Sequence, residues 1–172
     1  MKKVPVLLCI FFSGQVHAQS ACSANPVFRQ LDFWVGSWEA FGPKGRKAGD
    51  SKISIILDSC VVLEEWTSTS PVGGAIYAGK SFNTYNASTH QWQQTWVDNA
   101  GTSTLEYLEG KFEDKKMLFR TKPFNFSKDT VAVRSLTFFD LGPDKVRQLG
   151  QISKDNGITW VTEYDLEYRR KK

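Results

Sequence analysis

Residues 158–168, with the sequence ITWVTEYDLEY, carry the pattern that decides the fold. In an extended chain, successive side chains point to opposite faces. Trp160, Tyr164 and Tyr168 therefore share one face with Thr162 and Leu166, and the acidic residues between them share the other. This period of two predicts a β-strand whose aromatic face points into the protein.

Residues 90–98, with the sequence HQWQQTWVD, alternate in the same way and place Trp92, Gln94, Trp96 and Asp98 on one face. So many polar groups beside two tryptophans are unlike a purely hydrocarbon core. Comparable patterns predict about ten strands, at residues 37–42, 51–57, 60–69, 75–86, 90–98, 103–112, 115–122, 130–140, 145–153 and 158–168.

The connections between these strands are short and carry Gly, Asp, Asn or Pro, as at residues 98–101 and 142–144. Parallel neighbours would need crossover connections of about a dozen residues or more, so the strands are expected to be antiparallel. Closure of the sheet would remove its two exposed edges. We expect an all-β fold, an antiparallel up-and-down β-barrel with a short N-terminal helix at residues 26–34.

The first 18 residues have the layout of a secretory signal peptide. Lys2 and Lys3 precede an apolar run at residues 4–12, and a segment of small residues ends at Ala18. Cleavage near Ala18 would export a single domain, residues 19–172, to the periplasm or the medium and lower the formal charge from +4 to +2. So small a charge gives no reason to expect nucleic-acid binding, and no later apolar run approaches the ~20 residues of a transmembrane helix.

Two cysteines remain after this cleavage, Cys22 and Cys60. An exported protein reaches an oxidising space, so we expect a disulfide between them. A lipid anchor on Cys22 is the alternative, although residues 19–21 lack the leucine that normally precedes a lipidated cysteine. His90 is the only histidine within residues 19–172, and we therefore expect no metal site. We also expect no cofactor.

A barrel of this size can hold one small ligand, and ligand cavities combine apolar walls with a few polar groups. We expect ligand contacts from the inward-facing aromatic and polar residues Trp38, Glu64, Trp66, Tyr85, Trp92, Gln94, Trp96, Asp98, Phe119, Arg147 and Tyr164. Among these, Arg147 is the candidate counter-charge for Glu64 or Asp98. The pattern predicts an exported protein, monomeric or weakly dimeric, that binds a small, partly apolar molecule.

Two other functions are compatible with the same residues. Glu64, Asp98 and Arg147 could form the acid–base site of a hydrolase or isomerase, since burial separates the pKa values of two carboxyl groups. Alternatively, the aromatic side chains fill the barrel completely and the protein is a solid-core interaction module. A serine nucleophile is not expected, because the chain has no G-x-S-x-G sequence.

Seven segments in order resemble one family: residues 31–38 with their G-x-W element, 57–66, 79–86, 92–98, 146–148, 153–160 and 168–169. Together they resemble the DUF1579-type family of secreted bacterial proteins, which are described as lipocalin-like or calycin-like. The resemblance covers nearly all of residues 19–172 and implies a closed antiparallel barrel, but no known activity. The more distant nitrobindins hold haem through a late histidine, which this chain lacks.

Residues 153–160 also match the S-x-D-x-G-x-T-W pattern of the Asp-box turn in sialidase-like propellers. In such a turn Ser153 and Asp155 bond to the backbone, Gly157 takes a positive φ and Trp160 packs beneath. A propeller repeats this unit in every blade, whereas the chain has one copy. We therefore expect a structural turn here and no sialidase chemistry.

Overall fold

The computed structural model describes residues 21–101 and 104–172. The expected signal peptide and its cleavage site lie outside these residues. The elements in chain order are α1 (Ala21–Ala24), the 3₁₀ turns η1 (Pro26–Arg29) and η2 (Asp32–Trp34), and the strands β1 (Gly36–Phe41), β2 (Lys47–Ile56), β3 (Val61–Val72), β4 (Ala75–Asn86), β5 (Gln91–Asp98), β6 (Leu105–Glu113), β7 (Lys116–Arg120), β8 (Phe124–Ser127), β9 (Thr130–Asp140), β10 (Lys145–Ser153) and β11 (Val161–Arg170).

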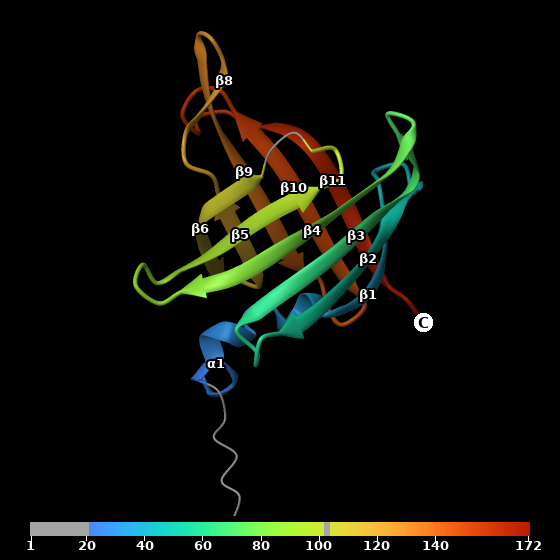
Figure 1. The fold of residues 1–172 in the computed structure, drawn as a ribbon, viewed down its shortest axis with the longest axis vertical. Helices are drawn as coiled ribbons and strands as arrows, with labels where there is room; N and C mark the ends of the chain where they lie inside the picture. Colours follow the sequence, from blue (N-terminus) through green and yellow to red (C-terminus); the bar gives the residue numbers. More distant parts are fainter. Residues whose placement is uncertain (1–20, 102–103) are drawn as a thin grey trace, which may run out of the picture.

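Ten of these strands form a closed antiparallel barrel (Figure 1). Each strand from β1 to β7 pairs with the next, β7 then pairs with β9, and β9, β10 and β11 follow in order. β11 returns to β1, with Ala40 opposite Tyr168, and this pairing closes the barrel. The short strand β8 forms a hairpin with β9. The all-β antiparallel barrel predicted from the alternation is therefore confirmed and is consistent with the lipocalin-like fold that the resemblance implied, with β8 as the one strand that the sequence did not indicate.

The N-terminal segment, residues 21–35, differs from the prediction of a single short helix at residues 26–34. Residues 26–34 form two 3₁₀ turns, and the side chain of Asn25 caps the first by accepting a hydrogen bond from the Val27 amide at 3.1 Å. Side chains three residues apart lie on the same side of a 3₁₀ helix. Leu31 and Trp34 therefore both point into the barrel, where they are fully buried.

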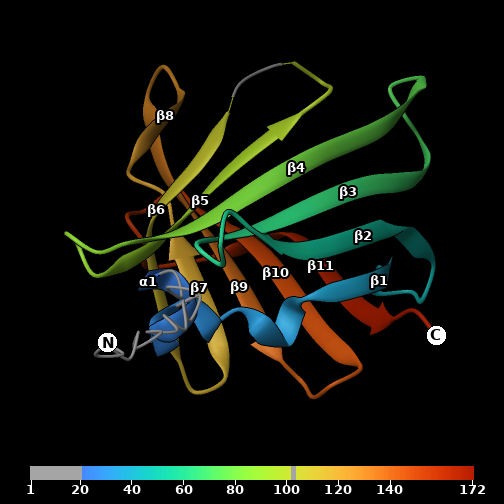
Figure 2. The same ribbon diagram turned by 60° about the horizontal axis from the view of Figure 1, so that its bottom comes forward.

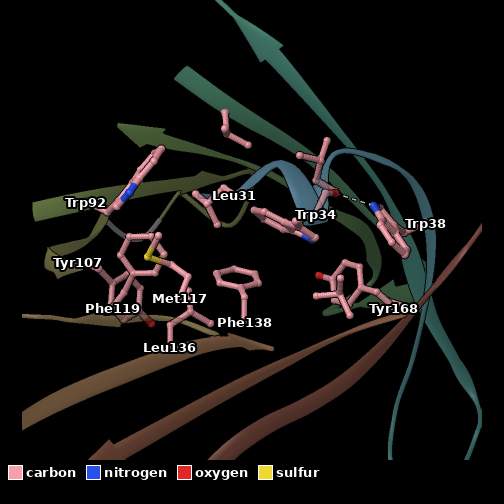
Figure 3. Close-up of a cluster of buried hydrophobic side chains, with 14 residues drawn as sticks. Leu31, Trp34, Trp38, Trp92, Tyr107, Met117, Phe119, Leu136, Phe138 and Tyr168 are labelled. Atoms are coloured by element: carbon pink, nitrogen blue, oxygen red, sulfur yellow. Dashed lines mark hydrogen bonds between the residues drawn. The ribbon is translucent and has the colours of Figure 1, made fainter. Parts of the chain in front are cut away.

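These two residues fill one end of the barrel (Figure 3). Trp34 packs on Phe138 with their ring centroids 4.3 Å apart, and its carbonyl oxygen accepts a 2.8 Å hydrogen bond from Nε1 of Trp38. Trp92 lies in the same cluster and donates from Nε1 to the side chain of Gln30 at 2.9 Å. This end is therefore solid. Figures 1 and 2 show the N-terminal turns here and the β3–β4 and β8–β9 hairpins at the opposite end.

A disulfide joins Cys22 to Cys60, as the sequence predicted. It fastens α1 to the residue before β3, across 38 positions of the chain. Arg29 adds a hydrogen bond from Nη2 to the carbonyl oxygen of Ser59 at 2.9 Å. The N-terminal segment is thus held to the barrel wall by a disulfide and by hydrogen bonds at Arg29, Gln30 and Trp34.

The segment before β11 forms a compact turn around Asp155. Its carboxylate accepts hydrogen bonds from the Ser153 hydroxyl at 2.7 Å and from the Thr159 amide at 2.9 Å. Gly157 has a φ of 87°, and Nε1 of Trp160 donates to the Gly157 carbonyl oxygen at 3.1 Å. These bonds keep residues 158–160 out of the sheet, so β11 starts at Val161 rather than at residue 158. No helix in the described part of the chain is long and apolar enough to cross a membrane.

Candidate functional site

A cavity of about 570 Å³ occupies the barrel between the solid end and the β3–β4 hairpin. Six aromatic residues line it, together with three acidic residues and one arginine. The aromatic residues are Trp66, Tyr77, Trp96, Tyr107, Tyr164 and Tyr168, and the charged ones are Glu64, Asp98, Glu163 and Arg134. Ala48, Ser68, Gln94, Leu105, Leu136, Gln148 and Leu166 complete the lining.

Glu64 lies on β3 in the deepest polar part of this lining and is 2% exposed. Ser51 on β2 donates to Glu64 Oε1 at 2.9 Å, and Ser81 on β4 donates to Oε2 at 3.1 Å. Strand register explains these contacts, because Glu64 pairs directly with Ser81 on β4 and with Ile53 on β2, and Ser51 lies two residues before Ile53 on the same face of β2. Three adjacent strands thus supply one carboxyl group and two hydroxyl groups to the same point.

Tyr168 adds a third hydroxyl group to the surroundings of Glu64. The hydroxyl group of Tyr168 lies 2.6 Å from Gln148 Oε1 and 3.3 Å from Glu64 Oε1. A hydroxyl group has one proton, and the shorter contact to Gln148 takes it. The contact from Tyr168 to Glu64 Oε1 is therefore the weaker of the two. Burial raises the pKa of Glu64 to about 7, against the lowering effect of its hydroxyl neighbours.

The network continues from Ser81 across β4 to β5. Asn83 donates from Nδ2 to Ser81 Oγ at 3.1 Å and to the carbonyl oxygen of Val62 at 3.0 Å. Gln94 donates from Nε2 to Asn83 Oδ1 at 2.8 Å. Ser81, Asn83 and Gln94 are all buried, and each makes at least one hydrogen bond within this network, as buried polar side chains usually do.

Asp98, at the end of β5, anchors a second polar group nearer the hairpin end. Its Oδ2 accepts hydrogen bonds from the Tyr77 hydroxyl at 2.8 Å and from Trp96 Nε1 at 2.9 Å. Partial burial raises the pKa of Asp98. These two bonds and the bond from the Ala100 amide together lower it by more, so the pKa of Asp98 is below its usual value. Asp98 is therefore a carboxylate at neutral pH.

The third acidic residue is neutralised within the cavity wall. Glu163 accepts two parallel hydrogen bonds from Arg134, at 2.9 Å from Nε and 3.1 Å from Nη2. Glu163 and Tyr164 are consecutive residues, yet both line the cavity. A register shift makes this possible, because Tyr164 pairs with Gly150 whereas Thr162 pairs with Gln151, which leaves Glu163 in a β-bulge.

Three of the aromatic residues lie against glycines of the neighbouring strand. A Cβ atom added to Gly79 would lie 2.2 Å from the ring of Trp96, and one added to Gly49 would lie 2.5 Å from the ring of Trp66. The ring of Tyr164 covers Gly150 in the same way. Each ring thus has one side against the backbone, which orients it along the wall of the cavity.

The structure brings six of the eleven expected ligand contacts to this cavity: Glu64, Trp66, Gln94, Trp96, Asp98 and Tyr164. Trp38, Trp92 and Phe119 instead belong to the solid end, where they are 0–1% exposed. Tyr85 also lies away from the cavity, packed between Phe28 and Trp92 at centroid distances of 5.7 and 6.0 Å.

Arg147 is not a counter-charge for Glu64 or Asp98, and that prediction is wrong. It forms two 2.8 Å hydrogen bonds with Asp165 and lies over the ring of Phe139, on the outer side of the barrel. The physical reason is the other face of β10, where Val146 is fully buried and occupies the interior. A catalytic group of Glu64, Asp98 and Arg147 therefore does not exist.

Several cavity residues were not singled out from the sequence. Alternation places Tyr77 in phase with Ser81 on β4, and Gln148 in phase with Val146 on β10, so the pattern contained a signal for both. The position of Glu163 had no such signal, because the bulge reverses the phase that alternation predicts. Within residues 21–101 and 104–172, no group of three or more His, Cys, Asp or Glu side chains is placed to hold a metal ion.

The cavity is thus a partly apolar chamber with two separate polar points. Glu64 provides a buried carboxyl group that titrates near neutrality, and Asp98 provides a fixed negative charge. Aromatic rings and aliphatic side chains form the surface between them. A closed barrel with this arrangement is compatible with the binding of a small molecule. No protein-family model and no curated protein matches the chain.

Proposed function

We propose that this protein is exported and binds a small, partly apolar molecule in the barrel cavity. The observation that carries the proposal is the cavity itself. Its volume of about 570 Å³ lies within the range of small-molecule sites, roughly 300–1,000 Å³. Its aromatic walls and few polar points are the composition typical of such sites. A barrel filled solid by its own side chains, the interaction module considered above, does not leave such a volume.

Export and family membership belong to the same proposal. The Cys22–Cys60 disulfide supports an oxidising compartment, and the N-terminal Lys2 and Lys3 with the following apolar run support a signal peptide. The ordered motifs and the barrel together support membership of the DUF1579-type proteins. Cleavage near Ala18 would release the domain into the periplasm or the medium.

The test is native mass spectrometry of the protein purified from the periplasm or secretions of its own host. We expect a non-covalent mass increment that disappears on denaturation. A matched pair of variants locates the ligand: Ser68→Phe adds a ring on the cavity wall, whereas Thr67→Phe adds it to the exposed outer face of β3. The first should lose the increment and the second should keep it. An unliganded wild-type mass that also gains nothing from host extract would contradict the proposal.

A second candidate function is proton-transfer catalysis by Glu64. The observation that favours it is the pKa of about 7, since a general acid or base works best when its pKa lies near the operating pH. In that case Glu64→Gln would retain binding and lose turnover. Without Arg147 in the cavity, this candidate depends on Glu64 and the hydroxyl groups around it.

A further inference from the structure

The charges lining the cavity do not balance. Arg134 is the single basic side chain in the lining, and the two parallel hydrogen bonds to Glu163 already satisfy it. Asp98 retains a full negative charge, and Glu64 adds a second when it ionises. The net charge of the lining is therefore −1 or −2, in a chain whose formal net charge is +4.

The aromatic faces of the cavity also lack a cation from the protein. Six arginine or lysine side chains lie over aromatic rings in the described part of the chain, and their partners are Phe41, Phe124, Phe126, Phe139, Trp38 and Trp160. None of these rings lines the cavity. Trp66 and Trp96 line the cavity, and tryptophan is the side chain that binds cations most strongly through its ring. Each ring lies against a glycine, and a tyrosine ring lies beside it with centroids 6.3 Å apart, Tyr168 for Trp66 and Tyr77 for Trp96.

Strand register places Trp66 on β3, and Trp96 and Asp98 on β5, on either side of β4; Asp98 has no basic partner in the lining. Trp66 on β3 pairs with Gly79 on β4, and Gly79 pairs with Asp98 on β5. Trp66 and Asp98 therefore lie on the strands on either side of Gly79, and the Tyr77 hydroxyl fixes the carboxylate in place. The ring of Trp96 lies over Gly79, and the ring of Trp66 lies over Gly49 on β2. Indole rings and a carboxylate without a basic partner on one stretch of cavity wall are features that attract an ammonium group.

We propose that the ligand is an organic cation, a protonated or quaternary amine on an apolar or aromatic body, with its charged group beside Asp98 and the rings of Trp66 and Trp96. This inference rests on the proposed binding function and adds the chemical class of the ligand. An anionic ligand would meet Asp98 with no free basic side chain in the lining to pair with. A neutral ligand would leave both the negative charge and the ring faces unused.

The experiment is isothermal titration of the purified protein with three probes of the same phenyl body. These are 2-phenylethylammonium as the cation, 2-phenylethanol as the neutral analogue and 3-phenylpropanoate as the anion. We expect the cation to bind about tenfold more tightly than the alcohol, as the sum of a cation–π contact and a charge-assisted contact, and the anion to bind most weakly.

Asp98→Asn tests the assigned residue, because the amide keeps an oxygen for Tyr77 and Trp96 and loses the charge. It should remove the charge-assisted part of the preference, so that the cation binds only about threefold more tightly than the alcohol, and leave the alcohol's affinity within about twofold. Asp165→Asn is the matched control, since Asp165 lies on the same barrel and pairs with Arg147 outside it. This variant should keep the wild-type preference.

The outcomes separate this inference from the proposed function. Equal or tighter binding of the alcohol or the anion by the wild-type protein would overturn the inference and leave a binding protein of another specificity. Failure of all three probes at millimolar concentration would also overturn it, and the native mass spectra would then decide on the binding function independently. The selectivity of the wild-type protein needs no variant, so the test holds even if Asp98→Asn does not fold.

Discussion

Glu64 is a buried carboxyl group whose hydrogen-bond partners are hydroxyl groups. Its carboxyl group lies among the hydroxyl groups of Ser51, Ser81 and Tyr168, without a cation in contact among the described residues. The phenols that face it, Tyr168 and Tyr164 on β11 and Tyr77 on β4, have pKa values above their usual range because burial disfavours the phenolate. They stay neutral throughout the range in which Glu64 titrates.

This environment makes the stability of the protein depend on pH. The pKa of Glu64 rises from 4.5 to about 7 on folding, so the folded state holds the proton over a range in which the unfolded state has lost it. The free energy of unfolding should therefore fall as pH rises from about 4.5 to 7, by about 3 kcal/mol, and then level off. Urea unfolding at pH 5 and pH 8 measures the difference.

Glu64→Gln should remove most of that difference and make the protein more stable than wild type at pH 8. Glu65→Gln is the control, because Glu65 is the next residue on β3, faces outward and pairs with Lys80, which lowers its pKa. This variant should leave the loss of stability between pH 5 and 8 in place. A wild-type protein equally stable at both pH values would show that Glu64 ionises without cost.

Gly79 is the other single residue on which the site depends. An alanine there would place its methyl group 2.2 Å from the ring of Trp96, so the ring and the Asp98 carboxylate that it holds would have to move. We expect Gly79→Ala to destabilise the protein by about 1–3 kcal/mol, the usual cost of overpacking. Thermal unfolding measures the change. Gly42→Ala is the control, since its nearest neighbour would be 3.9 Å away, and an equal effect of both would contradict the role of the ring contact.

Among the elements, the N-terminal segment fills one end of the barrel. It has few residues in regular structure, yet it inserts Leu31 and Trp34 into the solid end. The Cys22–Cys60 disulfide ties this segment to β3 and shortens the loop that the unfolded chain can explore. Such a closure over 38 residues contributes about 4 kcal/mol in the chain-entropy account.

The double variant Cys22→Ser, Cys60→Ser should therefore lose about 4 kcal/mol of unfolding free energy, by urea denaturation. Adding a reductant to the wild-type protein should reproduce most of the loss and have no effect on the double variant. The cavity lies at the far side of Trp34 and should retain its shape in the folded fraction. A double variant as stable as wild type would mean that the packing of Leu31 and Trp34 is sufficient by itself.

At the scale of the whole molecule, alternation was enough to predict the barrel but not the depth of each residue within it. Residues such as Trp92 and Trp96 share a face of β5, and the pattern treats them alike. Trp92 is buried in the solid end and Trp96 lines the cavity, because the N-terminal turns fill one end only. Depth depends on the stagger between strands and on the insertion of Trp34, and neither leaves a local signal in the sequence.

The direction of each face was a second limit. Alternation divides β10 into two faces, and the choice of the face with Arg147 as the interior was wrong because Val146 on the opposite face is apolar and buried. The bulge at Glu163 was a third, since one extra residue reverses the phase. These errors affect the candidate site more than the fold. The barrel prediction survives when one residue is assigned to the wrong face of a strand, whereas the prediction of a binding site depends on the face of each lining residue.

The packing of Trp66 and Trp96 against glycines has a practical consequence. The chain has six tryptophans, and these two are the ones that line the cavity. Their rings are held in one orientation, and the Nε1 group of Trp96 points at a carboxylate. We therefore expect a ligand that enters the cavity to change the emission of these two indoles, while Trp34, Trp38 and Trp92 in the solid end and Trp160 outside the cavity keep theirs. Tryptophan fluorescence can therefore report ligand entry without an added label, with the tryptophans outside the cavity as the internal reference.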